Sequence, residues 1–504
     1  MKDRILFWLG ADFTQFCISY GIQKECDSDL FAIVDITNKT KKFFLDQNLV
    51  SFNKIWFFHD NIKKPKSNPD VEYLKNFEKK YGIHLWQLAV NERIFYRFYN
   101  FYKFSTNEIL SILEQECKFF EDVLNQTNPN FLVIKEPAFH HLELFRQLCK
   151  AKGVTILMLN QSFVGKQCLI SEQARTFDLV NDFSQIKGVE QDFHKLQNYM
   201  ESTAVSKQIK IFNKRHAKSK INLLKAFLRY LISNNSNVHN HYTYYGRTKL
   251  KVIFNMAELL VKKKIRQYFI DTNLEKTIDT TKQFVYYPMA VDLERNLLLD
   301  APYYTNQIEV IRHIVKSLPP DHVLYIKENP SQDSREWRSI SEYKKIMNIP
   351  NVVLFHPHIR ASELLKHCKL VITISGTSAV EGAFHQKPAI VFGNVGSTIF
   401  PWVYKLKDMN ELPNAIKSSL EYKVQSADLD KFLKLQEQNC FEFDLFEFAA
   451  NFKDQFYYSG SLVDVEISIS QMDSFLKENE ILIEKLTREY LKKITLYKKF
   501  SNDT

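Results

Sequence analysis

The sequence has few residues that interrupt regular structure and no long hydrophobic run. Only 12 glycines and 14 prolines occur in 504 residues, which argues against long low-complexity linkers. No uncharged apolar run approaches the roughly 18 residues that a membrane-spanning helix requires. No heptad pattern or fixed-period repeat occurs, which excludes a coiled coil and a solenoid. With 45% hydrophobic residues, the chain is long enough for two or more packed domains.

Cysteine is also sparse. Its seven occurrences are scattered, odd in number and never arranged as C-x-x-C, which predicts a reducing compartment and no cysteine-based zinc site. The apolar run Ile5 to Leu9 is too short for the hydrophobic region of a signal peptide, and we interpret it as a first buried strand. We therefore expect a cytoplasmic protein, which could bind peripherally to the inner face of the plasma membrane.

Acidic residues are almost missing from residues 207–266, where Glu258 is the only one. The whole chain carries a net charge of +10, and its excess of lysine and arginine is concentrated in this region. Apolar residues recur there at helical spacing, from Leu223 to Leu231 and from Ile253 to Ile265. Basic amphipathic helices suit an anionic membrane, an anionic polymer or nucleic acid. The alternative is two helices packed on a domain, with their charges facing solvent.

Strand-like and helix-like segments alternate in two halves of the chain, which predicts an α/β fold with parallel sheets. The predicted strands of the first half are Ile5 to Leu9, Leu30 to Ile36, Lys54 to Phe58, Phe131 to Ile134 and Val154 to Leu159. Those of the second half are Phe284 to Tyr287, Val323 to Lys327, Val352 to Phe355, Leu370 to Ile374 and Ala389 to Gly393. We expect a Rossmann-like domain over residues 1–200, a basic helical insertion or linker over 201–275 and a second Rossmann-like domain over 276–425.

Residues 426–504 are expected to form a helical tail. Its apolar stripe includes Met472, Phe475, Ile481, Leu486 and Tyr490, and predicts that the helix packs against a domain or a partner.

The segment from Leu370 to Gly393 has the pattern of a phosphate-binding junction. An apolar strand leads into Ser375, Gly376, Thr377 and Ser378, and a helix carrying Glu381 follows. Small residues let the backbone approach a ligand, and the free N–H groups at a helix start attract an anion. A carboxylate one turn later could accept hydrogen bonds from ribose hydroxyls. The alternative is an ordinary turn, in which Thr377 or Ser378 caps the helix and Glu381 complements the helix dipole.

Two other loops follow strands of the same half. They are Lys327-Glu328-Asn329-Pro330 and His356-Pro357-His358. Functional loops of such sheets lie beyond the carboxyl ends of the strands, so we expect all three loops at one crevice.

Together these pieces resemble a family. Two Rossmann-like halves with this second-half element resemble the GT-B glycosyltransferases, and more closely the capsular polysaccharide biosynthesis family that includes bacterial Kdo transferases. The resemblance extends from about Phe284 to Asn394. It is carried by Phe284 to Met289, Pro302 to Pro320, Lys327 to Pro330 and Ile374 to Gly393.

The resemblance implies two domains facing a cleft, with the nucleotide-sugar donor on the C-terminal domain and the acceptor on the N-terminal one. Lys327, Glu328, Asn329 and Pro330 fall on the family's Lys-Glu-His-Pro motif, and Ser375, Gly376, Thr377 and Glu381 fall on its phosphate and ribose element. Asn329 and Ala290 stand where the family has histidines. Their loss argues against a CMP-sugar donor, leaves UDP- and GDP-sugars open, and raises the question of whether catalysis survives.

The expected chemistry requires a cation at the leaving phosphate and a base for the acceptor hydroxyl, and no metal is obligatory. We assign the cation to Lys327, for which a surface salt bridge to Glu328 is the alternative. Candidates for the base are Glu136, His140, His141 and Asp12, although each alone is more typical of a structural residue. His356 and His358 could contact the nucleobase or simply shape a turn.

The leading hypothesis is a glycosyltransferase that acts on a surface polysaccharide or glycolipid, held at an anionic membrane by its basic region. Alternatives are a non-catalytic protein of the same fold that serves polysaccharide assembly or export, and a nucleic-acid-binding protein using residues 207–266. No recognised nucleic-acid motif accompanies that charge. Motifs of P-loop NTPases, α/β-hydrolases, zincins and dinucleotide-binding folds are absent from the sequence.

Overall fold

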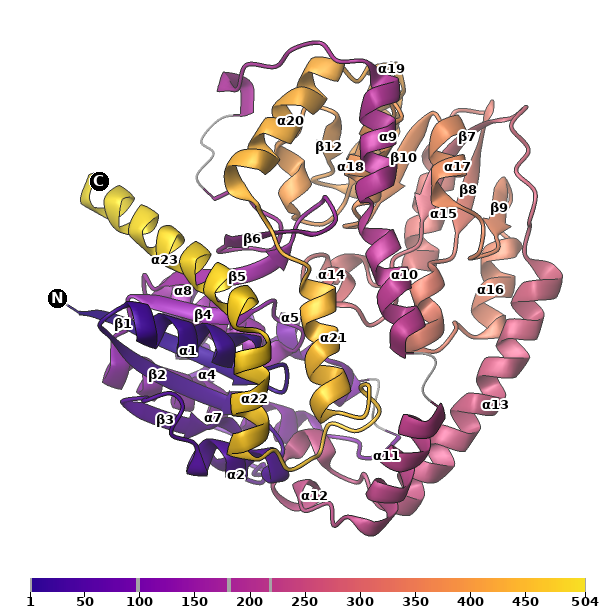
Figure 1. Cartoon of the computed structure of the whole chain (residues 1–504). Coiled ribbons are helices and arrows are strands. Elements are labelled where there is room, and N and C mark those ends of the chain that lie inside the picture. Colours follow the sequence, from indigo (N-terminus) through magenta and orange to yellow (C-terminus); the bar gives the residue numbers. More distant parts are fainter. Residues whose placement is uncertain (1, 97–99, 179–182, 217–219, 504) are drawn as a thin grey trace. The chain divides into compact units, whose positions relative to one another are not determined.

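The computed structural model describes residues 2–96, 100–178, 183–216 and 220–503. The chain forms two compact units. The N-terminal unit comprises residues 1–174, 204–251 and 440–504, and the C-terminal unit comprises residues 175–203 and 252–439. Each contains a largely parallel sheet with helices (Figure 1), as expected for two Rossmann-like domains and a helical C-terminal region. Unlike the four contiguous segments predicted, each unit is assembled from separated stretches of the chain.

Among the described residues, the sheet of the N-terminal unit has seven strands in the order β13-β6-β5-β4-β1-β2-β3. All five predicted strands are present: β1 (Asp3–Gly10), β2 (Ser28–Asp35), β3 (Lys54–Phe57), β4 (Phe131–Lys135) and β5 (Thr155–Gln161). They pair in parallel, and β1 is buried at nearly every position. Two antiparallel strands were not predicted: β6 (Gln167–Ser171), which forms a hairpin with β5, and the edge strand β13 (Phe441–Glu442). β13 pairs with β6, which is far away in the sequence, so no local pattern indicates it.

Helix α7 (Thr106–Thr127) begins with a capping box. Ser105 and Glu108 form a reciprocal capping box, which satisfies two of the N–H groups left open at a helix start. Helix α8 (His140–Ala151) follows β4. The other N-terminal helices of this unit are α1 (Thr14–Glu25), α2 (Asn38–Asp46), α3 (Phe58–Asn61), α4 (Val71–Tyr81), α5 (Leu85–Val90) and α6 (Arg93–Tyr96).

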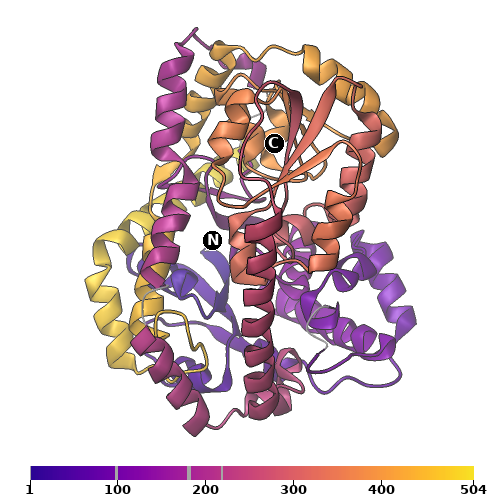
Figure 2. The same ribbon diagram turned by 90° about the vertical axis from the view of Figure 1, so that its right-hand side faces the viewer.

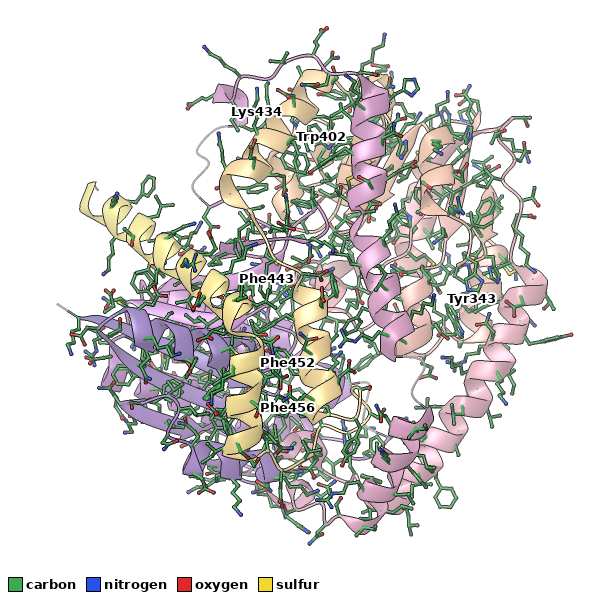
Figure 3. All side chains as sticks on the ribbon, viewed as in Figure 1. Tyr343, Trp402, Lys434, Phe443, Phe452 and Phe456 are labelled. Carbon is green, nitrogen blue, oxygen red and sulfur yellow. The ribbon has the colours of Figure 1, made fainter. Side chains whose placement is uncertain are left out.

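The C-terminal helices complete the core of the N-terminal unit. They are α21 (Leu445–Phe456), α22 (Ile469–Glu478) and α23 (Glu480–Asp503), and Figure 1 shows α22 and α23 beside α1. Phe452 and Phe456 of α21, labelled in Figure 3, pack on Phe475 of α22 with ring centroids 5.1 and 5.5 Å apart. The predicted packing of the tail against a domain is confirmed. The placement of Ile481 in the apolar stripe was wrong, because its side chain is 82% exposed.

The sheet of the C-terminal unit has the order β12-β11-β10-β7-β8-β9, and all its strands are parallel. The five predicted strands are β7 (Gln283–Pro288), β8 (His322–Lys327), β9 (Val352–Phe355), β10 (Leu370–Thr373) and β11 (Ala389–Val391), to which the fold adds β12 (Val403–Lys405). Its helices are α9 (Phe193–Thr203), α14 (Arg295–Leu298), α15 (Gln307–Ser317), α16 (Ile340–Met347), α17 (Ala361–His367), α18 (Ser378–Phe384), α19 (Leu412–Glu421) and α20 (Ser426–Asn439).

The described parts of residues 207–266 are mostly helical, as predicted. They span α10 (Val205–His216), α11 (Lys220–Ile232), α12 (Asn237–Asn240), the 3₁₀ turn η2 (Tyr242–Tyr244) and the long helix α13 (Lys249–Asn273), seen clearly in Figure 2. Lys218 lies outside the described residues, as do the side chains of Lys210 and Lys220. Among the described helices, none is both long and apolar enough to cross a membrane.

Candidate functional site

The predicted phosphate junction lies at the carboxyl edge of the C-terminal sheet, between β10 and α18. The N-cap residue Thr377 makes no side-chain capping bond, and its hydroxyl donates to Glu381 Oε1 at 2.8 Å. Ser378 is the first residue of the helix. Within the described structure, the amides of Thr377 and Ser378 have no hydrogen-bond acceptor. Two N–H groups therefore remain open to a ligand at this helix start.

Gly376 and Ser375 are held by contacts with neighbouring elements of the C-terminal unit. The Gly376 amide donates to Thr373 Oγ1 at 3.1 Å, and a Cβ at Gly376 would lie only 2.7 Å from that oxygen. The Ser375 hydroxyl donates to the carbonyl of Asn296 at 3.0 Å. The glycine is therefore required by packing against Thr373, and not by the approach of a ligand as predicted.

Glu381 is the acidic member of this junction. Burial raises the pKa of its carboxyl group, although the hydrogen bond from Thr377 and the positive charges of Arg175 and Lys327 act in the opposite direction. Lys327 is the last residue of β8, and its side chain is only 6% exposed. Lys327 therefore lies close enough to Glu381 for electrostatic attraction. Both residues belong to the predicted donor site.

Arg175 is a member of this group that sequence reasoning missed. Its backbone has φ +55°. Its carbonyl oxygen packs so closely against Gly396 that a Cβ on residue 396 would lie 1.7 Å from that oxygen. Nothing in the local sequence around Arg175 marks it, because its proximity to Glu381 comes from the return of residues 175–203 to the C-terminal unit.

Glu328 is a structural residue, because its carboxylate bonds to the protein and does not face a ligand. Its carboxylate is fully buried and accepts hydrogen bonds from Arg338 Nε at 2.8 Å, Tyr343 Oη at 3.0 Å and the Asn329 amide at 2.7 Å. Arg338 also pairs with Asp292 at 2.5 Å. This network ties the loop after β8 to the loop after β7, and it excludes the alternative that Glu328 forms a surface salt bridge with Lys327.

Asn329 caps the turn that follows it. Its Oδ1 accepts from the Ser331 amide at 3.0 Å, at the start of the 3₁₀ turn η4 (Pro330–Arg335). The residue that replaces the family histidine is thus used for local backbone structure.

The loop after β9 lies apart from the phosphate junction. Strands β7 and β8 separate β9 from β10, a distance of about 14 Å at normal strand spacing. His356 is buried and bonds to Asp271 at 2.9 Å, while its Nδ1 accepts from the His358 amide at 3.2 Å. His358 itself is exposed. The three predicted loops share one edge of the sheet, but the histidines do not join Lys327 and Glu381.

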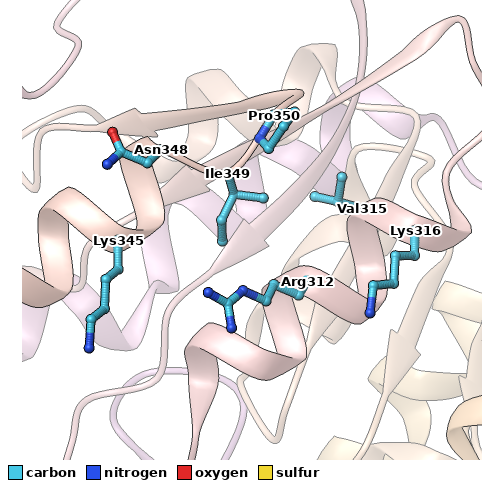
Figure 4. A pocket seen from close by; sticks show the side chains of 7 residues that line it. All are labelled: Arg312, Val315, Lys316, Lys345, Asn348, Ile349 and Pro350. Atoms are coloured by element: carbon cyan, nitrogen blue, oxygen red, sulfur yellow. The ribbon is translucent and has the colours of Figure 1, made fainter.

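A surface pocket of about 580 Å³ occupies a different part of the C-terminal unit (Figure 4). It is lined by the C-terminal part of α15, the end of α16 and the turn leading into β9, including Arg312, Lys345 and Pro350. These segments lie at the amino edge of the sheet, opposite the phosphate junction.

Asp12 is the acceptor-base candidate with the most suitable surroundings in the N-terminal unit. It follows β1, and its Oδ2 lies 3.6 Å from Lys135 Nζ at the end of the adjacent strand β4. Its Oδ1 is buried and has no hydrogen-bond partner in the described part of the chain. Gly10 leaves room for the lysine head, because a Cβ there would lie 3.2 Å from Lys135 Nζ.

The remaining base candidates differ in their surroundings. Glu136 follows β4 and is partly exposed. His140 is buried between two carboxylates: Nδ1 lies 3.0 Å from Glu92 and Nε2 lies 3.1 Å from Glu116. Burial lowers the pKa of His140, but the two carboxylates outweigh that effect and raise it to about 10. With both nitrogens engaged, His140 has no lone pair open to an acceptor hydroxyl, which corrects its assignment as a base.

His141 is likewise buried, with Nε2 3.2 Å from Asp35 Oδ2. Its ring is stacked on Phe58 with centroids 4.8 Å apart. This surrounding is typical of a structural histidine.

Residues 185–399 match the family model described as capsule polysaccharide biosynthesis protein, which covers somewhat less than half of the chain. This segment contains the whole range from Phe284 to Asn394, so the predicted resemblance is confirmed there. It also includes the whole basic region, residues 207–266. No curated protein matches the chain.

Several solved structures are similar over most of the chain. KpsC of Thermosulfurimonas dismutans, a beta Kdo 2,7 transferase, is 12% identical with a TM-score of 0.29, over 71% of this chain and 98% of its own. UDP-GlcNAc 2-epimerase of Methanocaldococcus jannaschii, in complex with UDP-GlcNAc and UDP, is 11% identical with a TM-score of 0.25, over 87% and 100%. At these scores, the matches say nothing about the activity of this chain.

Proposed function

We propose that the chain is a glycosyltransferase of capsule-type polysaccharide synthesis, which takes a sugar from a nucleotide-sugar donor. One observation carries the proposal: Glu381, Lys327 and Arg175 interact electrostatically next to the two open amides of Thr377 and Ser378. The match of residues 185–399 to the capsule polysaccharide biosynthesis family supports it. The donor binds the C-terminal unit, and the surface glycan or glycolipid acceptor binds the N-terminal unit.

The proposed chemistry relies on positioning and charge. The open amides and Lys327 stabilise the negative charge that develops on the departing nucleotide phosphate. Glu381 accepts hydrogen bonds from the ribose hydroxyls. Asp12 takes the proton of the acceptor hydroxyl, because its Oδ1 is not used by the protein itself. No step requires a metal.

The first test is protection of the chain against thermal unfolding by UDP-, GDP- and CMP-sugars. Binding to the folded state raises the melting temperature, and we expect a UDP- or GDP-sugar to do so. Glu381→Ala and Lys327→Ala should each lower turnover with that donor by about 100-fold. Matched controls are Glu363→Ala and Lys366→Ala on α17, an exposed ion pair 3.1 Å apart that is not part of the predicted site. If no nucleotide sugar stabilises the wild type, the proposal fails.

A second test addresses the base. Asp12→Asn should keep donor protection and lower transfer by roughly 100-fold or more, because the amide cannot accept the proton. Glu136→Gln is the matched carboxylate control. Equal loss in both variants would contradict the assignment of the base to Asp12.

A non-catalytic role in polysaccharide assembly or export is the second candidate. It is favoured by Asn329, whose side chain caps a turn where the family has histidine. This alternative predicts nucleotide binding without transfer to any acceptor. It also predicts that Asn329→His restores no activity.

We further propose that the basic helices hold the chain at an anionic membrane surface. On α11, exposed apolar side chains lie beside Lys225 and Arg229: Leu223 55%, Leu224 58%, Phe227 42%, Leu228 49% and Ile232 81% exposed. On α13 only Ile270 is buried among the described side chains, and Phe254 and Leu260 are 73% and 62% exposed. Apolar side chains next to cations suit the interface of a lipid bilayer.

Flotation with liposomes separates this proposal from nucleic-acid binding. Vesicles rich in phosphatidylserine should carry the chain upward, and neutral vesicles should not. Phe227→Ser and Phe254→Ser should weaken flotation while Lys366→Ala should not. Displacement by RNA, together with salt-sensitive RNA binding, would favour the nucleic-acid alternative.

A further inference from the structure

A buried cluster in the N-terminal unit has no part in the proposed transfer reaction. It joins Glu116 from the middle of α7, His140 and His141 from the first turn of α8, and Tyr242 from η2. All four residues are at most 3% exposed. They come from three elements, and Glu116 and Tyr242 are 126 residues apart in the chain, so no local sequence motif predicts the cluster.

The atoms that could bind a metal converge on one point. Glu116 Oε2 lies 3.1 Å from His140 Nε2, and Glu116 Oε1 lies 2.9 Å from Tyr242 Oη. Tyr242 Oη lies 3.5 Å from His141 Nδ1. The ligand atoms of Glu116, His140 and His141 all lie within 4.8 Å of one another. Tetrahedral zinc, with bonds of about 2.0–2.2 Å, places its ligand atoms roughly 3.3–3.6 Å apart. The contacts of 2.9, 3.1 and 3.5 Å are close to this spacing, and the upper limit of 4.8 Å requires the remaining ligand atoms to close in around the metal.

The opposite nitrogen of each histidine contacts a carboxylate. His140 Nδ1 lies 3.0 Å from Glu92 Oε2, and His141 Nε2 lies 3.2 Å from Asp35 Oδ2. Such carboxylates fix the ring orientation and the tautomer of metal-binding histidines, and make the free nitrogen a better donor to the metal. Both histidines are therefore oriented with one nitrogen toward Glu116 and Tyr242.

We propose that this cluster is a closed structural site for a divalent metal of zinc type, bound by Glu116, His140 Nε2, His141 Nδ1 and Tyr242 Oη. Imidazole, carboxylate and phenol oxygen form a donor set of intermediate softness, which suits zinc better than magnesium or calcium. Four protein ligands leave no position open for substrate, so the metal stabilises the fold. This site was not expected from the sequence, where the absence of cysteine pairs argued only against a cysteine-based zinc site.

The competing explanation is a proton in place of the metal. In that case His140 is an imidazolium that donates to Glu92 and Glu116, and the cluster is a closed hydrogen-bond network. When the metal binds, the proton on His140 Nε2 is released to solvent and the metal bonds to the vacated lone pair. The two explanations therefore predict opposite results for zinc.

The test uses the full chain without a histidine tag, equilibrated with a small excess of zinc and then freed of unbound metal. We expect about one zinc ion per chain by elemental analysis, and a melting temperature that rises with free zinc but not with magnesium. Replacement by cobalt should give the visible absorption of a tetrahedral site. If the wild type retains no zinc and cobalt gives no such absorption, the proposal is overturned, and this outcome does not depend on the folding of any variant.

Variants then locate the site. Glu116→Gln and His141→Gln keep the size of the side chain and should each lower zinc affinity by at least about 100-fold, while Glu92→Gln should lower it by about 10-fold. His322→Asn is the matched control, because His322 is a buried histidine of the other unit that bonds to Asp321. Zinc retained in full by both Glu116→Gln and His141→Gln would place the metal elsewhere and contradict the assignment.

Discussion

Arg338 and Glu328 form a buried ion pair in the C-terminal unit, with Nε and Oε2 2.8 Å apart and both side chains at most 4% exposed. Arg338 also pairs with Asp292 and donates to the carbonyl of Ala290. These contacts hold the loop after β7 against the loop after β8, next to Lys327. Glu328, which was predicted to bind the donor, therefore holds in place the loop next to Lys327.

Glu328→Gln should destabilise the chain by about 3 kcal/mol, because it leaves part of a buried guanidinium charge without its partner. The measurement is the free energy of unfolding in urea. The control is Glu363→Gln, which breaks an exposed ion pair and should change stability by less than about 0.5 kcal/mol. Equal effects of the two substitutions would contradict the role assigned to Glu328.

Glu381→Gln should stabilise the chain at neutral pH. Burial raises the pKa of this carboxyl in the folded state above its usual 4.5, so the folded state binds the proton more tightly than the unfolded chain. Wild-type stability is therefore lost as pH rises from about 4.5 through the raised pKa, whereas glutamine has no such loss. Unfolding curves of the two proteins should coincide near pH 4 and separate toward pH 7. A difference that is constant across this range would exclude a raised pKa.

Gly376→Ala should destabilise the C-terminal unit by roughly 1–3 kcal/mol, because the new Cβ would lie 2.7 Å from Thr373 Oγ1. Thr373→Ala removes that oxygen and its hydrogen bond from the Gly376 amide. The double variant should therefore be less destabilised than the sum of the two single variants, as a double-mutant cycle would show. Strict additivity would mean that the contact with Thr373 does not require the glycine.

Leu486→Ala should cost about 2–5 kcal/mol, since this side chain of α23 is fully buried in the core of the N-terminal unit. Ile481→Ala on the same helix is the control and should change stability by less than about 0.5 kcal/mol, because Ile481 is 82% exposed. Thermal and urea unfolding measure both. Comparable losses would contradict the observed packing of α23.

Hydrophobic patterning was sufficient to predict the ten strands β1 to β5 and β7 to β11, because strands of parallel sheets, most of them buried on both faces, appear as compact apolar runs. It also predicted the packing of the C-terminal helices. The loop containing Ser375, Gly376 and Thr377 was placed correctly, because short-range patterns of strand, small residues and helix determine it.

Contacts between distant segments were decided only by the tertiary structure. Sequence spacing does not reveal that Arg175 lies near Glu381, that Arg338 neutralises Glu328, or that β7 and β8 separate His356 from the phosphate junction. The same holds for Glu116, His140, His141 and Tyr242. A local pattern indicates which surface of an element is buried. A buried charge needs partners because its desolvation is costly. Those partners come from distant segments, so only the folded chain determines which residues they are.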